Sequence, residues 1–192
     1  MPTARRINNH KLKRVVIMNI IGILNNKNVK SLGKREAVVE AINTGLITIE
    51  EIQSFQNVLD DKKMALVLEA METVTNKNPG EADLDWLKFA QGYITSESKN
   101  LKRESSRIIG NISHLFPDDL EDAIQSLSKN TENEGTVIRW GSAYALGRIV
   151  AIPRYANSEL FNLVTDLYER ENDNGVKNQY LGGLKKAKKL RG

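Results

Sequence analysis

The chain has 192 residues, of which 40% are hydrophobic and 27% are charged, as in ordinary globular proteins rather than disordered or membrane proteins. It is long enough to bury a sizeable core or a short array of repeats. The absence of Cys excludes disulfides and thiol chemistry, and two His are too few for a histidine metal cluster, so no metal or cofactor is expected.

The net charge of +4 conceals an uneven distribution. Residues 1–35 carry nine Lys and Arg and no acid, and residues 175–192 carry six and no acid. All 24 acidic residues therefore lie between two basic ends, which makes the middle of the chain strongly negative.

The first predicted element is a capping helix over residues 9–26. Basic residues followed by VVIMNIIGIL at 15–24 imitate a secretory signal, but Asn19 interrupts the apolar run and NNKNVK stands where a cleavage site belongs. The run is also shorter than the roughly 20 residues that cross a bilayer. We therefore expect a buried helix of a cytoplasmic protein, without a membrane partner.

Further along the chain, VIRWGSAYALGRI at 137–149 combines helical periodicity with small residues. Positions 138, 141, 142, 145, 146 and 149 fall on one helix face and hold Ile, Gly, Ser, Ala, Leu and Ile. Small residues in the middle of an apolar stripe let a second helix approach closely. The pattern predicts a tightly packed helix.

The same template fits the chain five times. Its anchor residues are separated by 29, 38, 37 and 38 positions and are Ile42, Met71, Ile109, Leu146 and Leu184. A second set of helices alternates with these and contributes core positions that include Ile124 and Leu163. This period is typical of a helical solenoid, and no segment alternates like a strand.

Start signals mark the second helices. They are Thr48 with Glu51 as a capping box, Asp83 after Pro79-Gly80, Pro117-Asp118, and Asn157 after Pro153. We predict an all-α single domain with helix pairs at 34–61, 62–98, 99–133 and 135–172 and a C-terminal capping helix at 174–190. Each repeat would bury its faces only against its neighbours, as one cooperative array.

IRWGSAYALGRI and the earlier LKRESSRIIGNI resemble the first helix of HEAT-type repeats, in which an aliphatic and a basic residue precede small residues, Leu-Gly and an aliphatic. The resemblance covers roughly residues 34–190 and is sharpest over 101–170. It implies a right-handed α-α superhelix of about four to five helix pairs. It also implies a structural role for the recurring basic residue, which in such repeats often bonds loop carbonyls or an Asp: Arg35, Lys102, Arg139 and Lys177.

The resemblance further implies that the second helices line the concave surface. These helices are rich in Asp and Glu, so the surface would attract basic peptides. The alternative is that the acids gather at helix N-termini, where the macrodipole favours them.

One second helix adds aromatic residues. In DLDWLKFAQGYI, Trp86, Phe89 and Tyr93 lie off the core stripe, and aromatic rings on a surface are common binding anchors. The alternative is that a neighbouring helix covers them, and the same two interpretations apply to Trp140. The candidate partner-binding residues are Trp86, Tyr93, Asp83, Asp85, Trp140 and Arg139.

No catalytic constellation is found: there is no phosphate loop, nucleophile elbow or His pair at ligand spacing. The leading hypothesis is a non-catalytic scaffold that binds a protein or peptide, which could be basic. The alternative is nucleic-acid binding through KKAKKLR at 185–191 together with Arg5, Arg6, Lys11, Lys13 and Arg14.

An enzymatic version of this alternative also rests on a resemblance. Alkylpurine DNA glycosylases are built of HEAT-like repeats and place Trp, Asp and Arg in a basic groove. Asp85, Trp86, Arg139 and Trp140 supply these residue types, but the chain is short for that family and its expected groove is acidic. No motif of the family can be matched residue by residue.

Overall fold

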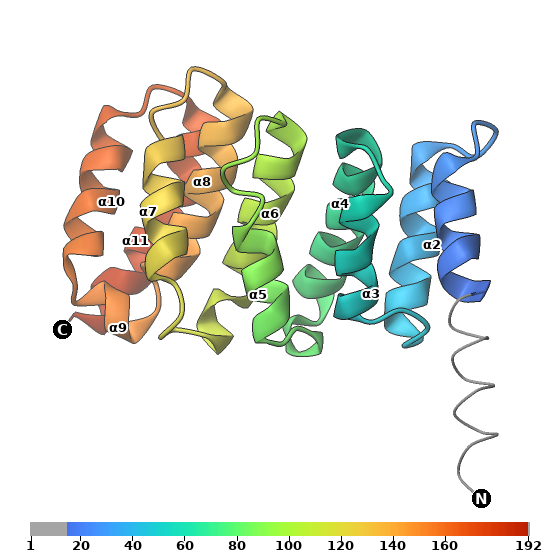
Figure 1. Cartoon of the computed structure of the whole chain (residues 1–192). Coiled ribbons are helices and arrows are strands. Elements are labelled where there is room, and N and C mark those ends of the chain that lie inside the picture. Colours follow the sequence, from blue (N-terminus) through green and yellow to red (C-terminus); the bar gives the residue numbers. More distant parts are fainter. Residues whose placement is uncertain (1–14, 192) are drawn as a thin grey trace, which may run out of the picture. The chain divides into compact units, whose positions relative to one another are not determined.

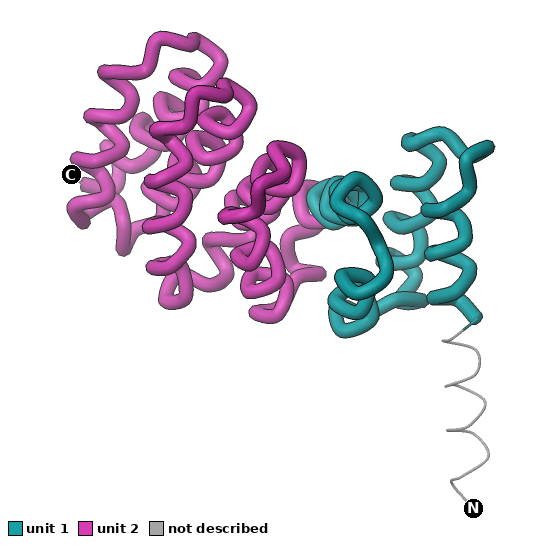
Figure 2. Tube along the Cα trace, turned by 45° about the horizontal axis from the view of Figure 1, so that its top comes forward, with its two compact units in different colours: residues 1–74 teal, residues 75–192 magenta. Residues whose placement is uncertain are grey.

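The computed structural model describes residues 15–191, and every regular element among them is a helix (Figure 1). This confirms the predicted all-α class. The chain divides into two compact units, residues 1–74 and 75–192 (Figure 2). The cooperative unfolding of all repeats as one array stays a prediction. None of the helices within residues 15–191 is both long and apolar enough to cross a membrane.

The first unit begins with helical residues 15–25, whereas residues 9–14 of the predicted capping helix and the basic residues Arg5 to Arg14 lie outside the described residues. The next elements are α2 (Ser31–Asn43), α3 (Ile49–Ser54), η1 (Phe55–Asn57) and α4 (Asp61–Lys77), whose last residues belong to the second unit.

Local sequence sets the boundary between α2 and α3. Gly45 follows the C-cap residue of α2 and has a φ of 67°. Glycine adopts this left-handed conformation without strain. The backbone N–H of Thr48 then donates to the Glu51 carboxylate at 2.7 Å, which confirms the predicted capping box.

The second unit contains two layers of helices. α6, α8 and α11 form one layer, in which α8 packs between the other two (Figure 1). Each helix of the other layer packs on the next helix of the first: α5 on α6, α7 on α8 and α10 on α11. The bounds are η2 (Pro79–Glu81), α5 (Leu84–Gln91), α6 (Lys99–Ile112), η3 (Ser113–Leu115), α7 (Glu121–Asn130), α8 (Thr136–Ile149), α9 (Pro153–Ala156), α10 (Glu159–Arg170) and α11 (Asn174–Leu190).

Hydrogen bonds between successive repeats reflect the sequence period. Asn130 Nδ2 donates to the carbonyl of Ile94, 36 positions earlier, at 2.9 Å. The Tyr155 hydroxyl donates to the carbonyl of Pro117, 38 positions earlier, at 2.8 Å. Because these separations equal one repeat, the bonds fix how adjacent repeats stack.

The small residues of α8 are packing contacts, as predicted. The face that carries Ile138, Gly141, Ala145 and Leu146 is buried. A Cβ atom on Gly141 would lie 3.2 Å from the Cα of Arg103 on α6. On the side of α8 that faces α11, the backbones of these two helices are in still closer contact.

Gly147 and Gly183 meet where α8 crosses α11. A Cβ atom on Gly183 would overlap the backbone carbonyl of Gly147, and one on Gly147 would overlap the carbonyl of Gln179. Neither obstacle is a flexible side chain, so a larger residue would force the helices apart.

Two predicted helix starts are wrong by a few residues. α7 begins at Glu121 rather than at Pro117-Asp118. α10 begins after Ser158, whose hydroxyl accepts the N–H of Leu160 at 3.2 Å. Pro153 instead starts the short helix α9, and Asn157 ends it.

We expect Gly183→Ala to lower the free energy of unfolding by about 1–3 kcal/mol, because its methyl group overpacks the contact between α8 and α11. Gly182→Ala is the matched control: a Cβ atom at Gly182 meets nothing within 4 Å, so helix propensity alone should stabilise the chain by up to about 1 kcal/mol. Denaturant unfolding measures both. Equal midpoints for the two variants would contradict the packing account.

Candidate functional site

Trp86 is buried rather than exposed on the surface. Its side chain is only 5% exposed, and Phe89 is equally buried. Tyr93 is half-buried and meets the Phe89 ring edge-on at 5.3 Å. A ring with so little exposure cannot act as a surface anchor, which corrects the hypothesis of an exposed aromatic stripe on α5.

The acids beside Trp86 serve the helix start. One carboxylate oxygen of Asp83 accepts the N–H groups of Asp85 at 3.0 Å and Trp86 at 3.2 Å. Asp85 is exposed in the first turn of α5. Capping and the helix dipole account for both acids, so they give no separate indication of a partner.

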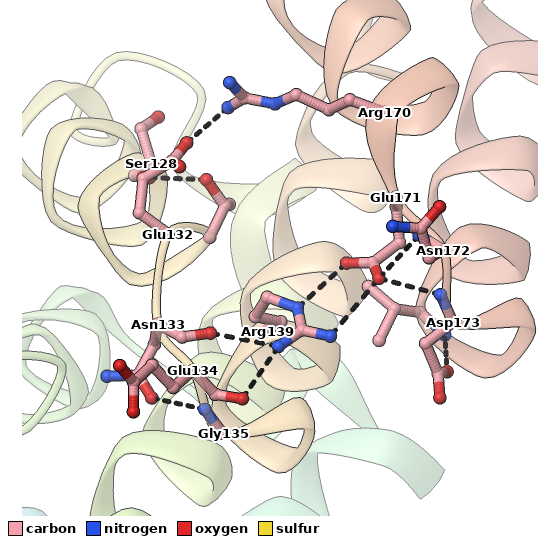
Figure 3. Close-up of polar contacts among 12 residues, drawn as sticks. Ser128, Glu132, Asn133, Glu134, Gly135, Arg139, Arg170, Glu171, Asn172 and Asp173 are labelled. Carbon is pink, nitrogen blue, oxygen red and sulfur yellow. Dashed lines mark hydrogen bonds and ion pairs between the residues drawn. The ribbon is translucent and has the colours of Figure 1, made fainter.

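Arg139 joins two loops (Figure 3). Its Nε and Nη2 atoms donate to the two carboxylate oxygens of Glu171 at 3.0 and 3.3 Å. Its Nη1 atom donates to the carbonyls of Asn133 and Glu134, both at 3.0 Å. The structural role implied by the HEAT resemblance is therefore confirmed at Arg139, although the acid is a Glu.

The pKa values of this pair change in the directions that a strong ion pair requires. Burial acts to raise the pKa of Glu171, but hydrogen bonds from Arg139 and the Asp173 N–H outweigh it and lower the pKa. The hydrogen bond to Glu171 raises the pKa of Arg139. The pair stays charged and holds the loop before α8 to the loop before α11.

Trp140 lies beside a shallow cavity. It is half-buried, and its ring centroid is 5.4 Å from that of Tyr144. The cavity measures about 400 Å³ and is lined by Arg103, Arg107, Thr136, Val137 and Trp140. Trp140 and the guanidinium of Arg139 thus belong to different environments, and the structure does not bring the six candidate residues together.

A larger depression runs along α7 and α10, which lie side by side (Figure 1). Two adjoining cavities of about 680 and 620 Å³ share Glu121 and Ile124. We call them the α7–α10 groove. Its lining includes Glu121, Asp122, Ile124, Gln125, Ser128 and Glu132 on the α7 side, and Tyr155, Glu159, Leu163 and Asp166 on the α10 side.

Two apolar side chains in this groove were expected in the core. Leu163 is 36% exposed and Ile124 is half-buried. Both occupy core-stripe positions of their helices, but the groove leaves their side chains open to solvent. The helical spacing of these two residues predicted burial and did not indicate their exposure.

The groove is negatively charged. Five of its lining residues are acids, namely Glu121, Asp122, Glu132, Glu159 and Asp166, whereas the bases are Lys129 and Arg154. The pKa of the Tyr155 hydroxyl responds to this field: burial raises it first, Arg154 opposes, and Glu121, Asp118 and Asp119 raise it further.

Helix dipoles explain only part of this charge. Glu121 and Asp122 lie in the first turn of α7 and Glu159 in that of α10, where the dipole favours acids. Asp166 lies past the first turn of α10 and Glu132 lies beyond the end of α7. No group of three or more His, Asp or Glu within residues 15–191 could hold a metal ion.

We expect Arg139→Gln to lower the free energy of unfolding by about 2–4 kcal/mol, because it removes the positive partner of the Glu171 carboxylate and the donor to two carbonyls. The Arg139 and Glu171 side chains are 20% and 9% exposed, whereas those of Arg170 and Glu132 are 57% and 65% exposed. Arg170→Gln is therefore the control and should cost less than about 1 kcal/mol.

The same pair predicts a pH dependence. Because the pKa of Glu171 is lowered in the folded protein, its stabilisation is complete above the ordinary value of 4.5 and is lost as pH falls through the lowered value. The stability gap between wild type and Arg139→Gln should narrow on acidification. A gap that widens below pH 4.5 would contradict the assignment.

Neither a protein-family model nor a curated protein matches this chain. Among solved structures, an engineered protein determined by the Northeast Structural Genomics Consortium matches with a TM-score of 0.64 at 15% identity, covering 91% of this chain and 80% of that chain. A second engineered protein from the same consortium matches with a TM-score of 0.59 at 14% identity, covering 90% of this chain and 47% of that chain. At these identities the likeness shows the fold alone.

Proposed function

We propose that this protein is a non-catalytic interaction module whose α7–α10 groove binds a basic segment of a partner protein. The observation that carries the proposal is the combination of open apolar side chains, Ile124 and Leu163, with a surrounding excess of carboxylates. Interfaces commonly join an apolar centre to a charged rim in this way.

The apolar part of the groove would supply affinity. Covering Leu163 and Ile124 with an aliphatic side chain of the partner removes apolar surface from water, at roughly 25 cal/mol per Å². A single well-buried anchor of this kind is typical of the few residues that dominate binding energy. The partner segment therefore needs an aliphatic or aromatic residue.

The carboxylates would supply selectivity and speed. Glu121, Glu159 and Asp166 are exposed, so their pairing with Lys or Arg of a partner would be weakened by solvent and salt. Their summed field would accelerate the approach of a basic segment and repel an acidic one. The resemblance to HEAT-type repeats also supports the proposal, because the second helix of each pair lines the binding surface in those proteins.

The proposal predicts selective binding of a basic synthetic peptide with one central Leu over a peptide of the same length with its charges reversed. Glu159→Lys with Asp166→Lys should weaken binding at least tenfold at low salt, with a smaller loss at high salt. Leu163→Gln should weaken it to a similar extent at all salt concentrations. Fluorescence anisotropy of labelled peptides measures each affinity.

The control is Asp85→Lys, which reverses the charge of a single exposed acid outside the groove. At physiological salt it should leave affinity within about threefold of wild type, since screening there limits the reach of an exposed charge to about 8 Å. Equal binding of the basic and charge-reversed peptides would overturn the proposal. So would wild-type affinity in both groove variants.

A further inference from the structure

A second groove lies in the other layer of the second unit. It occupies about 600 Å³ between the C-terminal ends of α6 and α8 and the middle of α11. We call it the α11 groove. Its lining includes Ser113 and His114 after α6, Gly147, Arg148, Ala151 and Ile152 at the end of α8, and Asn178, Gln179, Gly182 and Lys186 on α11.

The charge of this groove is opposite to that of the α7–α10 groove. Among the described residues that line it, Arg148 and Lys186 are basic and none is an acid. Residues 175–192 contain no acid at all, and the side chains of Lys185, Lys186, Lys188 and Lys189 are exposed. An anion in the groove would meet positive potential along the adjoining face of α11.

Helix dipoles oppose this potential without cancelling it. The C-terminal ends of α6 and α8 reach the groove, and each is equivalent to roughly half a negative charge. Lys186 lines the groove, and Lys185, Lys188 and Lys189 are exposed on the same helix, so the potential along α11 stays positive. The Arg148 guanidinium lies 3.4 Å from the centre of the Tyr144 ring, and that contact fixes it at the edge of the groove.

The groove offers neutral donors and space for an extended anion. The Asn178 and Gln179 amides lie one turn before Gly182 on α11, and amides are common donors to phosphate oxygens. A Cβ atom at Gly182 would meet nothing within 4 Å, so the surface there is open.

The described lining contains no Phe, Tyr or Trp. Proteins that hold single-stranded nucleic acid stack its bases on aromatic rings, whereas a duplex already stacks its own bases and presents its phosphates. The surface chemistry therefore fits a duplex backbone better than a single strand.

We propose that the α11 groove binds the phosphodiester backbone of double-stranded nucleic acid without sequence selectivity. This function goes beyond peptide binding in the α7–α10 groove and does not depend on it, since the two grooves share no lining residue. The groove contributes charge and donors, and no base-reading contact is required.

The test compares two double variants that each lower the net charge by two. Gly182→Glu with Lys186→Gln places the change in the groove, and the open space at Gly182 accepts the new side chain. Lys185→Gln with Lys188→Gln changes two exposed residues of α11 that do not line the groove. Circular dichroism and thermal unfolding first establish that both variants fold.

Binding of a labelled DNA duplex of arbitrary sequence is then measured by fluorescence anisotropy over a series of salt concentrations. We expect wild-type affinity to fall with salt, the groove variant to lose at least tenfold at low salt, and its salt slope to decrease by about one per lost phosphate contact. The control variant should lose less than about threefold.

Three results would overturn the proposal. The first is that wild type shows no salt-dependent binding of the duplex, and the second is that the two variants lose equal affinity. The third is that wild type binds phosphatidylserine vesicles more tightly than the duplex and that the groove variant loses this vesicle binding. Wild-type duplex affinity in Leu163→Gln, which changes the α7–α10 groove without changing its charge, would support the proposal. Peptide binding by the α11 variants separates the two proposals, since loss of duplex binding alone leaves the α7–α10 proposal unaffected.

Discussion

The backbone contact between Gly147 of α8 and Gly183 of α11 is the constraint on which the second unit depends. A side chain at either position would overlap a backbone carbonyl, so the two helices reach this separation only because both residues are glycine. On its opposite side α8 meets α6, where Gly141 faces the Arg103 backbone. α8 is thus held on both sides by close contacts, and α7 of the other layer packs on it.

This packing separates charge between the two layers. Because α6, α8 and α11 bury their small and aliphatic faces against one another, the polar faces turn outward, and that of α11 is basic. α7 and α10 carry the acids instead, and they border a groove in which Leu163 and Ile124 stay open. The two proposals rest on these opposite charges: a basic peptide is proposed for the acidic groove and a nucleic-acid duplex for the basic one.

Residue spacing predicted which residues pack in the core better than it predicted which residues are exposed on the surface. The stripe from Ile138 to Ile149 and the anchors 37 or 38 residues apart predict the core correctly because helix packing depends on periodic positions. Trp86 lies off the stripe and is nevertheless buried, and Leu163 lies on the stripe and is partly exposed. The helical period shows which residues share a face, but not how much of that face a neighbouring helix covers. Glu171 lies 32 residues beyond Arg139, so no local pattern identified it as the partner.

The central claim is that Ile124 and Leu163 form the floor of a groove that receives a basic segment. Methyl-selective NMR of these two residues, during titration with a basic peptide that contains one Leu, tests it most directly. The account predicts that the Ile124 and Leu163 methyl resonances shift and saturate together, while that of Val137, an exposed residue beside Trp140, stays unchanged. Saturable shifts at Val137 without shifts at Ile124 and Leu163, or no shift at any of the three, would contradict it.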